Sequence, residues 1–125
     1  MTLKKKQRVV VVGASPKPER YSNQAVRLLV QHGHTVVPVN PAASSIEGLS
    51  VVPRLEDLDS HIDTITLYIS AKRSSVLEGP ITRLHPDRVI FNPGAENAAL
   101  CAALEAQGIH TEEACTLVLL KTNQF

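Results

Sequence analysis

The chain has 125 residues, 43% of them hydrophobic, and its 13 Lys and Arg nearly balance its 12 Asp and Glu. This length suits one domain with a buried core, so we expect a single domain over residues 1–125, with residues 1–7 as a flexible N-terminus. The balanced charge excludes an overall field that would attract nucleic acid or an anionic membrane, and no stretch approaches the roughly 20 apolar residues of a membrane-spanning helix.

The first third of the chain predicts a strand, a helix and a second strand. Residues 9–12 are four valines, an unbroken apolar run typical of a strand buried on both faces of a parallel sheet. Apolar residues at helical spacing follow, with Ser22 as the expected N-cap and Gly33 as the expected stop. The second strand covers residues 35–39 and ends at the turn-forming pair Asn40-Pro41.

The middle of the chain predicts less regular structure. Residues 42–53 are expected to form an irregular connection, with a short strand at Val51 and Val52. A helical turn over residues 54–62 and a strand over residues 64–70 follow. Apolar residues between 76 and 84 indicate a helix, which Gly79-Pro80 is expected to break or restart.

The last third repeats the alternation of strand and helix. Residues 88–91 predict a strand, and Asn92-Pro93-Gly94 then turns the chain into an Ala-rich helix that Gly108 closes. Residues 109–111 are expected to begin a last edge strand, followed by a short helical or irregular tail. This alternation predicts an α/β fold with a doubly wound, mostly parallel sheet.

In a sheet of this kind, ligands bind outside the carboxyl ends of the strands, where the strand order reverses. This rule points to four segments, at residues 13–22, 40–48, 70–74 and 92–97. In the first segment, Gly13 allows the backbone to approach a phosphate closely, and the following helix directs its N-terminus at the same space. Ser15 offers a hydroxyl, and Lys17 and Arg20 offer positive charge, although each cation is equally compatible with an ordinary exposed position.

The end of the second strand carries no acidic residue. An NAD site places a carboxylate there to accept hydrogen bonds from the ribose hydroxyls, whereas this strand ends at Val39-Asn40-Pro41 and the next carboxylate is Glu47. A neutral side chain with cations nearby suits a nucleotide that carries a further phosphate on its ribose. Both NADP and coenzyme A meet this requirement.

Several motifs together resemble a known family. They are "VGAS" at 12–15 with Pro18 and Ser22, "GHTVVPVNP" at 33–41, Ile46 with Gly48, "ID" at 62–63 and "NPGAEN" at 92–97. The chain resembles the small single-domain coenzyme A-binding proteins with a Rossmann-like fold, which are similar to the N-terminal module of the succinyl-CoA synthetase alpha subunit. It departs from the usual pattern of that family at Val52, Arg54 and Asn92, where Tyr, Ser and commonly Gln stand. The resemblance implies coenzyme A binding and no established reaction.

No residue pattern predicts catalysis or a metal site. The five histidines lie in no nucleophile or metal motif, and Ser15 lacks the surroundings of a nucleophile elbow. Glu96 is interpreted as a carboxylate in the first turn of a helix, where the helix dipole stabilises it. Cys101 and Cys115 have no metal-site spacing; as unpaired thiols they indicate the cytoplasm, and Cys115 is expected to pack as a small hydrophobe.

We therefore expect a non-catalytic module that binds coenzyme A or an acyl-CoA, alone, as a homo-oligomer or beside a partner subunit. Its diphosphate is expected at the 13–15 turn, its adenosine near Asn40 and its pantetheine along residues 93–96. Two alternatives remain: a coenzyme A-binding subunit of a multi-chain acyl-CoA synthetase or transferase, and an NADP-binding redox protein. The expected ligand contacts are Gly13, Ala14, Ser15, Lys17, Arg20, Ser22, Val39, Asn40, Pro41, Ile69, Ser70, Arg73, Pro93, Gly94 and Glu96.

Overall fold

The computed structural model describes residues 5–125; the part of the expected flexible N-terminus at residues 1–4 lies outside it. Gln7, at the other end of that segment, donates its backbone N–H to His34 Nδ1 (3.0 Å). The elements in chain order, with η for 3-10 helices, are β1 (Arg8–Val12), α1 (Tyr21–Gln31), β2 (Thr35–Val39), β3 (Ser45–Ile46), β4 (Leu49–Ser50), η1 (Leu55–Asp57), β5 (Thr64–Leu67), α2 (Ala71–Ser74), η2 (Ser75–Leu77), α3 (Glu78–Leu84), β6 (Arg88–Phe91), α4 (Ala98–Ala106), β7 (His110–Glu113) and α5 (Thr116–Lys121).

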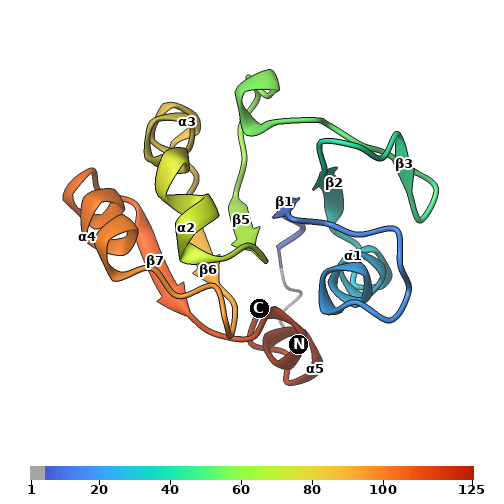
Figure 1. Cartoon of the computed structure of the whole chain (residues 1–125). Helices are drawn as coiled ribbons and strands as arrows, with labels where there is room; N and C mark the ends of the chain where they lie inside the picture. Colours follow the sequence, from blue (N-terminus) through green and yellow to red (C-terminus); the bar gives the residue numbers. More distant parts are fainter. Residues whose placement is uncertain (1–4) are drawn as a thin grey trace.

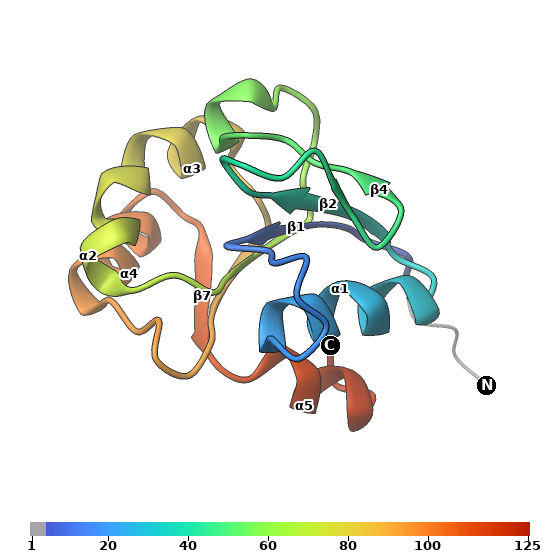
Figure 2. The same ribbon diagram turned by 45° about the vertical axis from the view of Figure 1, so that its right-hand side comes forward.

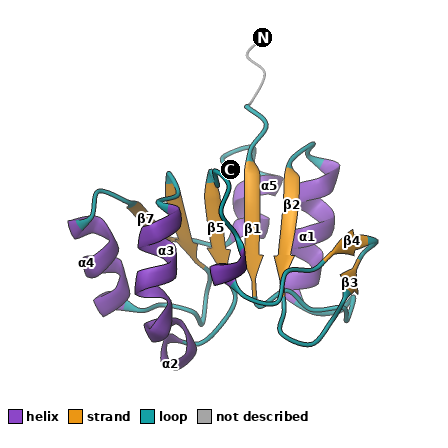
Figure 3. Ribbon diagram, turned by 90° about the horizontal axis from the view of Figure 1, so that it is seen from above, coloured by secondary structure: helices purple, strands orange, loops and turns teal. Residues whose placement is uncertain are grey.

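A five-stranded parallel sheet in the order β2-β1-β5-β6-β7 forms the centre of the fold. Figure 3 shows the arrows of β1, β2 and β5 pointing the same way. The chain moves outward from β1 to β2 and then returns to the other side of β1 at β5, so the strand order reverses between β1 and β5. The predicted doubly wound, Rossmann-like α/β fold is confirmed, and the rule for such sheets directs attention to the carboxyl ends of these two strands.

Helices cover both faces of this sheet. α1 and α5 lie side by side on one face, and α2, α3 and α4 lie on the other (Figures 1 and 2). Val9 and Val11 belong to the core cluster under α1, whereas Val10 and Val12 belong to the cluster on the opposite face. The unbroken valine run in β1 follows from this arrangement, because both of its faces exclude water.

A buried polar cluster fixes α5 to the sheet. Asn92 Nδ2 donates to Thr66 Oγ1 (2.6 Å), and Thr66 Oγ1 is 2.8 Å from Thr116 Oγ1. Asn92 Oδ1 in turn accepts from the backbone N–H of Thr116, the first residue of α5 (2.9 Å). Asn92 therefore joins β5, β6 and α5. None of the helices in the described residues is long and apolar enough to cross a bilayer.

Several boundaries differ from the sequence predictions. The expected irregular connection contains the β3–β4 hairpin, and β5 ends at Leu67 rather than at residue 70. The helix restarts beside Gly79-Pro80, as one of the two expected outcomes: α3 begins at Glu78 after η2, and Pro80 lies in its first turn, where a missing backbone N–H costs no intrahelical bond. The N-cap of α1 is Arg20, not Ser22, because Gln24 N donates to Arg20 O and so places the first turn at Tyr21.

Candidate functional site

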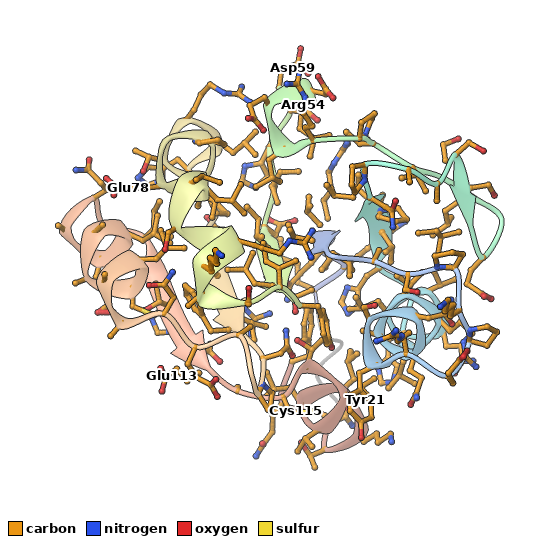
Figure 4. All side chains as sticks on the ribbon, viewed as in Figure 1. Tyr21, Arg54, Asp59, Glu78, Glu113 and Cys115 are labelled. Atoms are coloured by element: carbon orange, nitrogen blue, oxygen red, sulfur yellow. The ribbon has the colours of Figure 1, made fainter. Side chains whose placement is uncertain are left out.

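A cavity of about 550 Å³ opens at the carboxyl ends of the strands, within the size range of small-molecule and cofactor sites. All the expected ligand contacts line it except Val39 and Glu96. Sequence reasoning missed three lining residues, Tyr21, Tyr68 and Ala95. The lining comes from the loops after β1, β2, β5 and β6, so the fold brings together the four segments that the sequence had indicated separately. Figure 4 shows this face of the molecule, with Tyr21 labelled beside α1.

Gly13 brings the loop after β1 against the chain that follows β5. Its φ is +84°, in the region that glycine adopts without strain. A Cβ added at Gly13 would lie 2.8 Å from Ile69 Cγ2 and 3.1 Å from the carbonyl oxygen of Tyr68. Both the backbone conformation and the available space therefore require glycine here, and Gly13, Tyr68 and Ile69 all line the cavity.

Three side chains, one from the cavity lining and two from α1, hold the carbonyl groups of the loop between β1 and α1. Asn40 Nδ2 donates to Ala14 O (2.8 Å), Asn23 Nδ2 donates to Ser15 O (2.9 Å) and Arg27 Nη2 donates to Pro18 O (2.8 Å). Free carbonyl oxygens beside the cavity would repel an anion, and these three are already occupied. The loop has one glycine where a dinucleotide fingerprint has several, and its shape is fixed by these side-chain donors.

Asn23 is the centre of this arrangement. Its side chain is fully buried, and besides Ser15 it contacts two charged groups. Asn23 Oδ1 accepts from Arg27 Nε (2.8 Å), and Asn23 Nδ2 lies 3.1 Å from Glu47 Oε2 at the tip of the β3–β4 hairpin. The hairpin that sequence reasoning missed thus supports the loop after β1 through a single buried amide.

Asn40 has a structural function at the end of β2. Its Nδ2 is bonded to Ala14 O, and its Oδ1 accepts from the backbone N–H groups of Ala42 (2.7 Å) and Ala43 (2.8 Å). Both ends of this amide are engaged within the protein, so it has little capacity left to bind a ribose. Asn40 instead ties the loop after β2 to the loop after β1.

The wall after β6 is built by a turn and a helix cap. Glu96 does not lie in the first turn of a helix as expected, because α4 begins at Ala98 with Asn97 as its N-cap. The Glu96 carboxylate instead accepts from the backbone N–H of Gly94 (2.9 Å). Asn97 Oδ1 accepts from Leu100 N (3.1 Å) and Asn97 Nδ2 donates to Ser74 Oγ (2.9 Å), which joins α4 to α2.

The charge of the cavity lining has one sign. Lys17, Arg20 and Arg73 line it, and no Asp or Glu is found among the lining residues in the described part of the chain. Arg20 is the N-cap of α1, and its side chain makes no hydrogen bond to the helix. The Arg20 side chain therefore does not occupy the N–H groups of the first turn, which a ligand could use. Three cations and a helix N-terminus facing one cavity favour a ligand with several negative charges.

Tyr68 adds an apolar surface to the same cavity. Burial raises the pKa of Tyr68 well above its usual range, so the phenol is neutral at physiological pH. Its place just beyond β5 gave no chemical signal in the sequence, where it is one residue of an apolar strand pattern. The cavity thus combines charged groups with an aromatic surface, a combination found in small-molecule and cofactor sites.

A second hollow of about 240 Å³ adjoins the first. Gly13, Pro41, Ile69 and Arg73 line both spaces. The second hollow is mainly apolar, and Val39, expected as a ligand contact, lies here rather than in the larger cavity. Its further lining is Val12, Pro53, Arg54, Leu55, Glu56 and Leu77.

In the part of the chain that the structure describes, one group of possible metal ligands lies at the opposite end of the sheet. His61, Asp63 and Asp87 place their ligand atoms within 4.8 Å of one another. The Asp63 carboxylate already accepts from the backbone N–H of Arg8 (2.7 Å) and lies 2.9 Å from His61 Nε2. The hydrogen bond from Arg8 is the main cause that lowers the pKa of Asp63. These contacts give Asp63 a structural function at the amino ends of the strands, away from the cavity.

Comparison with known proteins identifies the family. A family model described as a CoA binding domain matches residues 7–121. The chain belongs to this family. The resemblance to coenzyme A-binding proteins found in the sequence motifs is thereby confirmed.

Relatives of this CoA binding domain include proteins named only as uncharacterized. Uncharacterized protein YneT of Bacillus subtilis (strain 168) is 31% identical over 77 residues, which cover 62% of this chain and 55% of the relative. The match therefore spans little more than half the length of that relative.

Solved structures share the whole architecture. A crystal structure of an uncharacterized protein has a TM-score of 0.93 and 34% identity, covering 98% of this chain and 100% of that chain. A hypothetical protein from Pyrococcus horikoshii OT3 has a TM-score of 0.88 and 25% identity, covering 96% and 85%. A dinucleotide-forming acetyl-coenzyme A synthetase 1 from Ca. Korarchaeum cryptofilum has a TM-score of 0.74 and 20% identity, covering 86% of this chain and 25% of that one, and this likeness concerns the fold alone.

Proposed function

We propose that the cavity binds coenzyme A or an acyl-CoA, without catalysis by this chain. The observation that carries the proposal is the cavity of about 550 Å³ whose described lining has Lys17, Arg20 and Arg73 and no carboxylate. Membership of the CoA binding domain family supports the same ligand. The ligand diphosphate would lie at the start of α1, where backbone N–H groups and two cations favour an anion.

The lining residues support an assignment for the remaining parts of the ligand. The adenosine extends toward the end of β2, and the pantetheine extends past Pro93 and Gly94, where the turn held by Glu96 borders the cavity. No histidine is found among the described lining residues, and Ser15 Oγ accepts from the backbone N–H of Lys17 (3.1 Å). Ser15 therefore serves to shape the loop, and binding without a covalent step accounts for the groups present.

Isothermal titration of the purified protein with coenzyme A and with NADP tests the ligand. Coenzyme A should bind and NADP should bind more weakly, because a pantetheine can follow the wall after β6 and a nicotinamide cannot use it in the same way. Tight binding of NADP with no heat from coenzyme A would exclude the proposed ligand. Native mass spectrometry of freshly purified protein checks the same point, since a retained ligand reveals its own mass.

Lys17 provides the test of the phosphate contact. We expect Lys17→Ala to weaken coenzyme A binding roughly tenfold at low salt, because a charge-assisted hydrogen bond to phosphate is lost. The difference should shrink as ionic strength rises. Lys121→Ala, an exposed cation on α5 outside the lining, is the matched control. Equal affinities of Lys17→Ala and the wild type at low salt would assign Lys17 to the ordinary solvated surface.

A further inference from the structure

We infer that the second hollow and its two arginines recognise the adenosine 3′-phosphate of the ligand, so that the protein selects coenzyme A over 3′-dephospho-coenzyme A. The inference rests on the proposed function, because it assigns a subsite to one part of the same ligand. Arg54 is the residue that this inference adds. It stands where the resembled family usually has Ser, so the family pattern assigns it no function.

The chemistry of the hollow suits a purine base. Val12, Val39, Leu55 and Leu77 give it an apolar lining, and it joins the larger cavity along Gly13, Pro41, Ile69 and Arg73. Glu56 also lines the hollow and supplies a hydrogen-bond acceptor beside this apolar surface. An apolar slot with one acceptor fits a base that carries an amino group, and the carboxylate disfavours a phosphate at the same depth.

The hollow is lined by two arginines, one of which lies at its boundary with the larger cavity. Arg73 lines both the hollow and the larger cavity, and Arg54 lines the hollow alone. A ligand with its base in the hollow and its diphosphate at α1 must place its ribose across this boundary. Arg73 at this boundary and Arg54 within the hollow supply two guanidinium groups that complement a phosphate on the ribose.

Arg54 is available for such a contact. Among the described residues it makes one ion pair, from Nη2 to Asp57 Oδ1 at 3.7 Å, and the two side chains are 67% and 40% exposed. An exposed pair at this distance contributes little to stability, so a phosphate can replace Asp57 at small cost. The Arg54 side chain is therefore free to turn toward a ligand in a way that a buried, bidentate arginine would not be.

The position of Arg54 separates it from the diphosphate site. Figure 4 shows Arg54 beside η1 and Tyr21 beside α1, on opposite sides of the strand ends. Lys17 and Arg20 lie in the loop before α1, so they serve a different negative group from the one that Arg54 serves. The amide of Asn40, the other polar group at the end of β2, is occupied by Ala14, Ala42 and Ala43. Recognition at the ribose therefore depends on the arginines.

The test compares two ligands that differ only in the 3′-phosphate. Isothermal titration of the wild-type protein at low salt should give an affinity for coenzyme A about tenfold above that for 3′-dephospho-coenzyme A. In Arg54→Gln, the affinity for coenzyme A should fall severalfold while that for 3′-dephospho-coenzyme A changes much less, so the ratio between the two ligands approaches one. Lys17→Ala should instead weaken both ligands by a similar factor, because both carry the diphosphate.

Lys72→Gln is the matched control for loss of a nearby charge, because Lys72 is an exposed cation on α2 that lines neither space. It should leave the ratio between the two ligands as in the wild type. Arg54 is exposed, so thermal unfolding of Arg54→Gln should match that of the wild type and rule out misfolding as the cause. Equal binding of both ligands by the wild type would overturn the inference and leave the proposed function standing. If neither ligand binds, the proposed function itself is overturned.

Discussion

At Gly13, the left-handed backbone and the lack of space act on the same residue. A φ of +84° disfavours any other residue, and the Cβ of alanine would lie 2.8 Å from Ile69 Cγ2. Gly48 shares the positive φ (+77°) but has no atom within 4 Å of an added Cβ. Comparing substitutions at Gly13 and Gly48 therefore separates the free-energy cost of the backbone conformation from the cost of the steric contact.

We expect Gly13→Ala to lower the free energy of unfolding by about 2 to 3 kcal/mol, since a strained φ and a forced shift of Ile69 add together. Gly48→Ala should cost about 1 kcal/mol, from the backbone conformation alone. Urea unfolding followed by circular dichroism measures both values. Equal losses in the two variants would show that the chain after β5 gives way to the added methyl group.

At the level of elements, the loop between β1 and α1 depends on partners that are far away in the sequence. Asn23 on α1 joins Ser15 O to Glu47 of the β3–β4 hairpin, and Asn40 after β2 holds Ala14 O. Because these partners hold the loop before a ligand arrives, less conformational entropy is lost when the ligand binds.

Asn23→Ala should remove this support. We expect it to destabilise the protein by about 2 kcal/mol, because it leaves buried partners without hydrogen bonds, and to weaken coenzyme A binding as the loop loosens. The amide hydrogens of the non-proline residues of the loop, Ser15, Lys17, Glu19 and Arg20, should exchange faster in hydrogen-exchange mass spectrometry. Gln24→Ala, which removes only an exposed contact to Glu19 O, serves as the control. Unchanged exchange in the Asn23 variant would show that the loop holds its shape without the clamp.

Across the whole molecule, the two ends of the sheet have separate functions. The carboxyl ends carry the cavity, and the amino ends carry structural contacts such as the hydrogen bond from Arg8 N to Asp63 Oδ2 (2.7 Å). That hydrogen bond, with help from His61, holds the pKa of Asp63 below the ordinary value of 3.8. Asp63 therefore stabilises the fold fully above about pH 4, and this stabilisation is lost as the pH falls through its lowered pKa.

Asp63→Asn should lower the free energy of unfolding at pH 7 by about 1 kcal/mol, because a charge-assisted hydrogen bond becomes a neutral one. The variant should also lose less stability than the wild type when the pH is lowered from 5 to 3. Urea unfolding across this range measures both effects, with exposed Asp59→Asn as the control. Parallel pH curves for the wild type and Asp63→Asn would contradict the function assigned to Asp63.

The fold could be predicted because it depends on local patterns. Apolar runs, helical spacing and turn residues indicated every strand of the main sheet, although β5 proved shorter than expected. Local signals failed where tertiary contacts set the outcome. Ser22 has the chemistry of an N-cap, yet the hydrogen bond from Gln24 N to Arg20 O begins α1 earlier, and the β3–β4 hairpin has no strong strand pattern.

The sequence by itself determined the doubly wound sheet and the four segments at its carboxyl ends, because periodicity and strand direction are properties of neighbouring residues. Only the tertiary structure decided what each polar side chain does. It engaged the Asn40 amide, buried Asn23 beneath the loop and brought Arg54 and Arg73 into the lining of one hollow, since these arrangements join residues distant in the chain. Long-range hydrogen bonds and shared cavities produce no regular pattern of residues in a sequence. They arise only when the sheet brings its loops together.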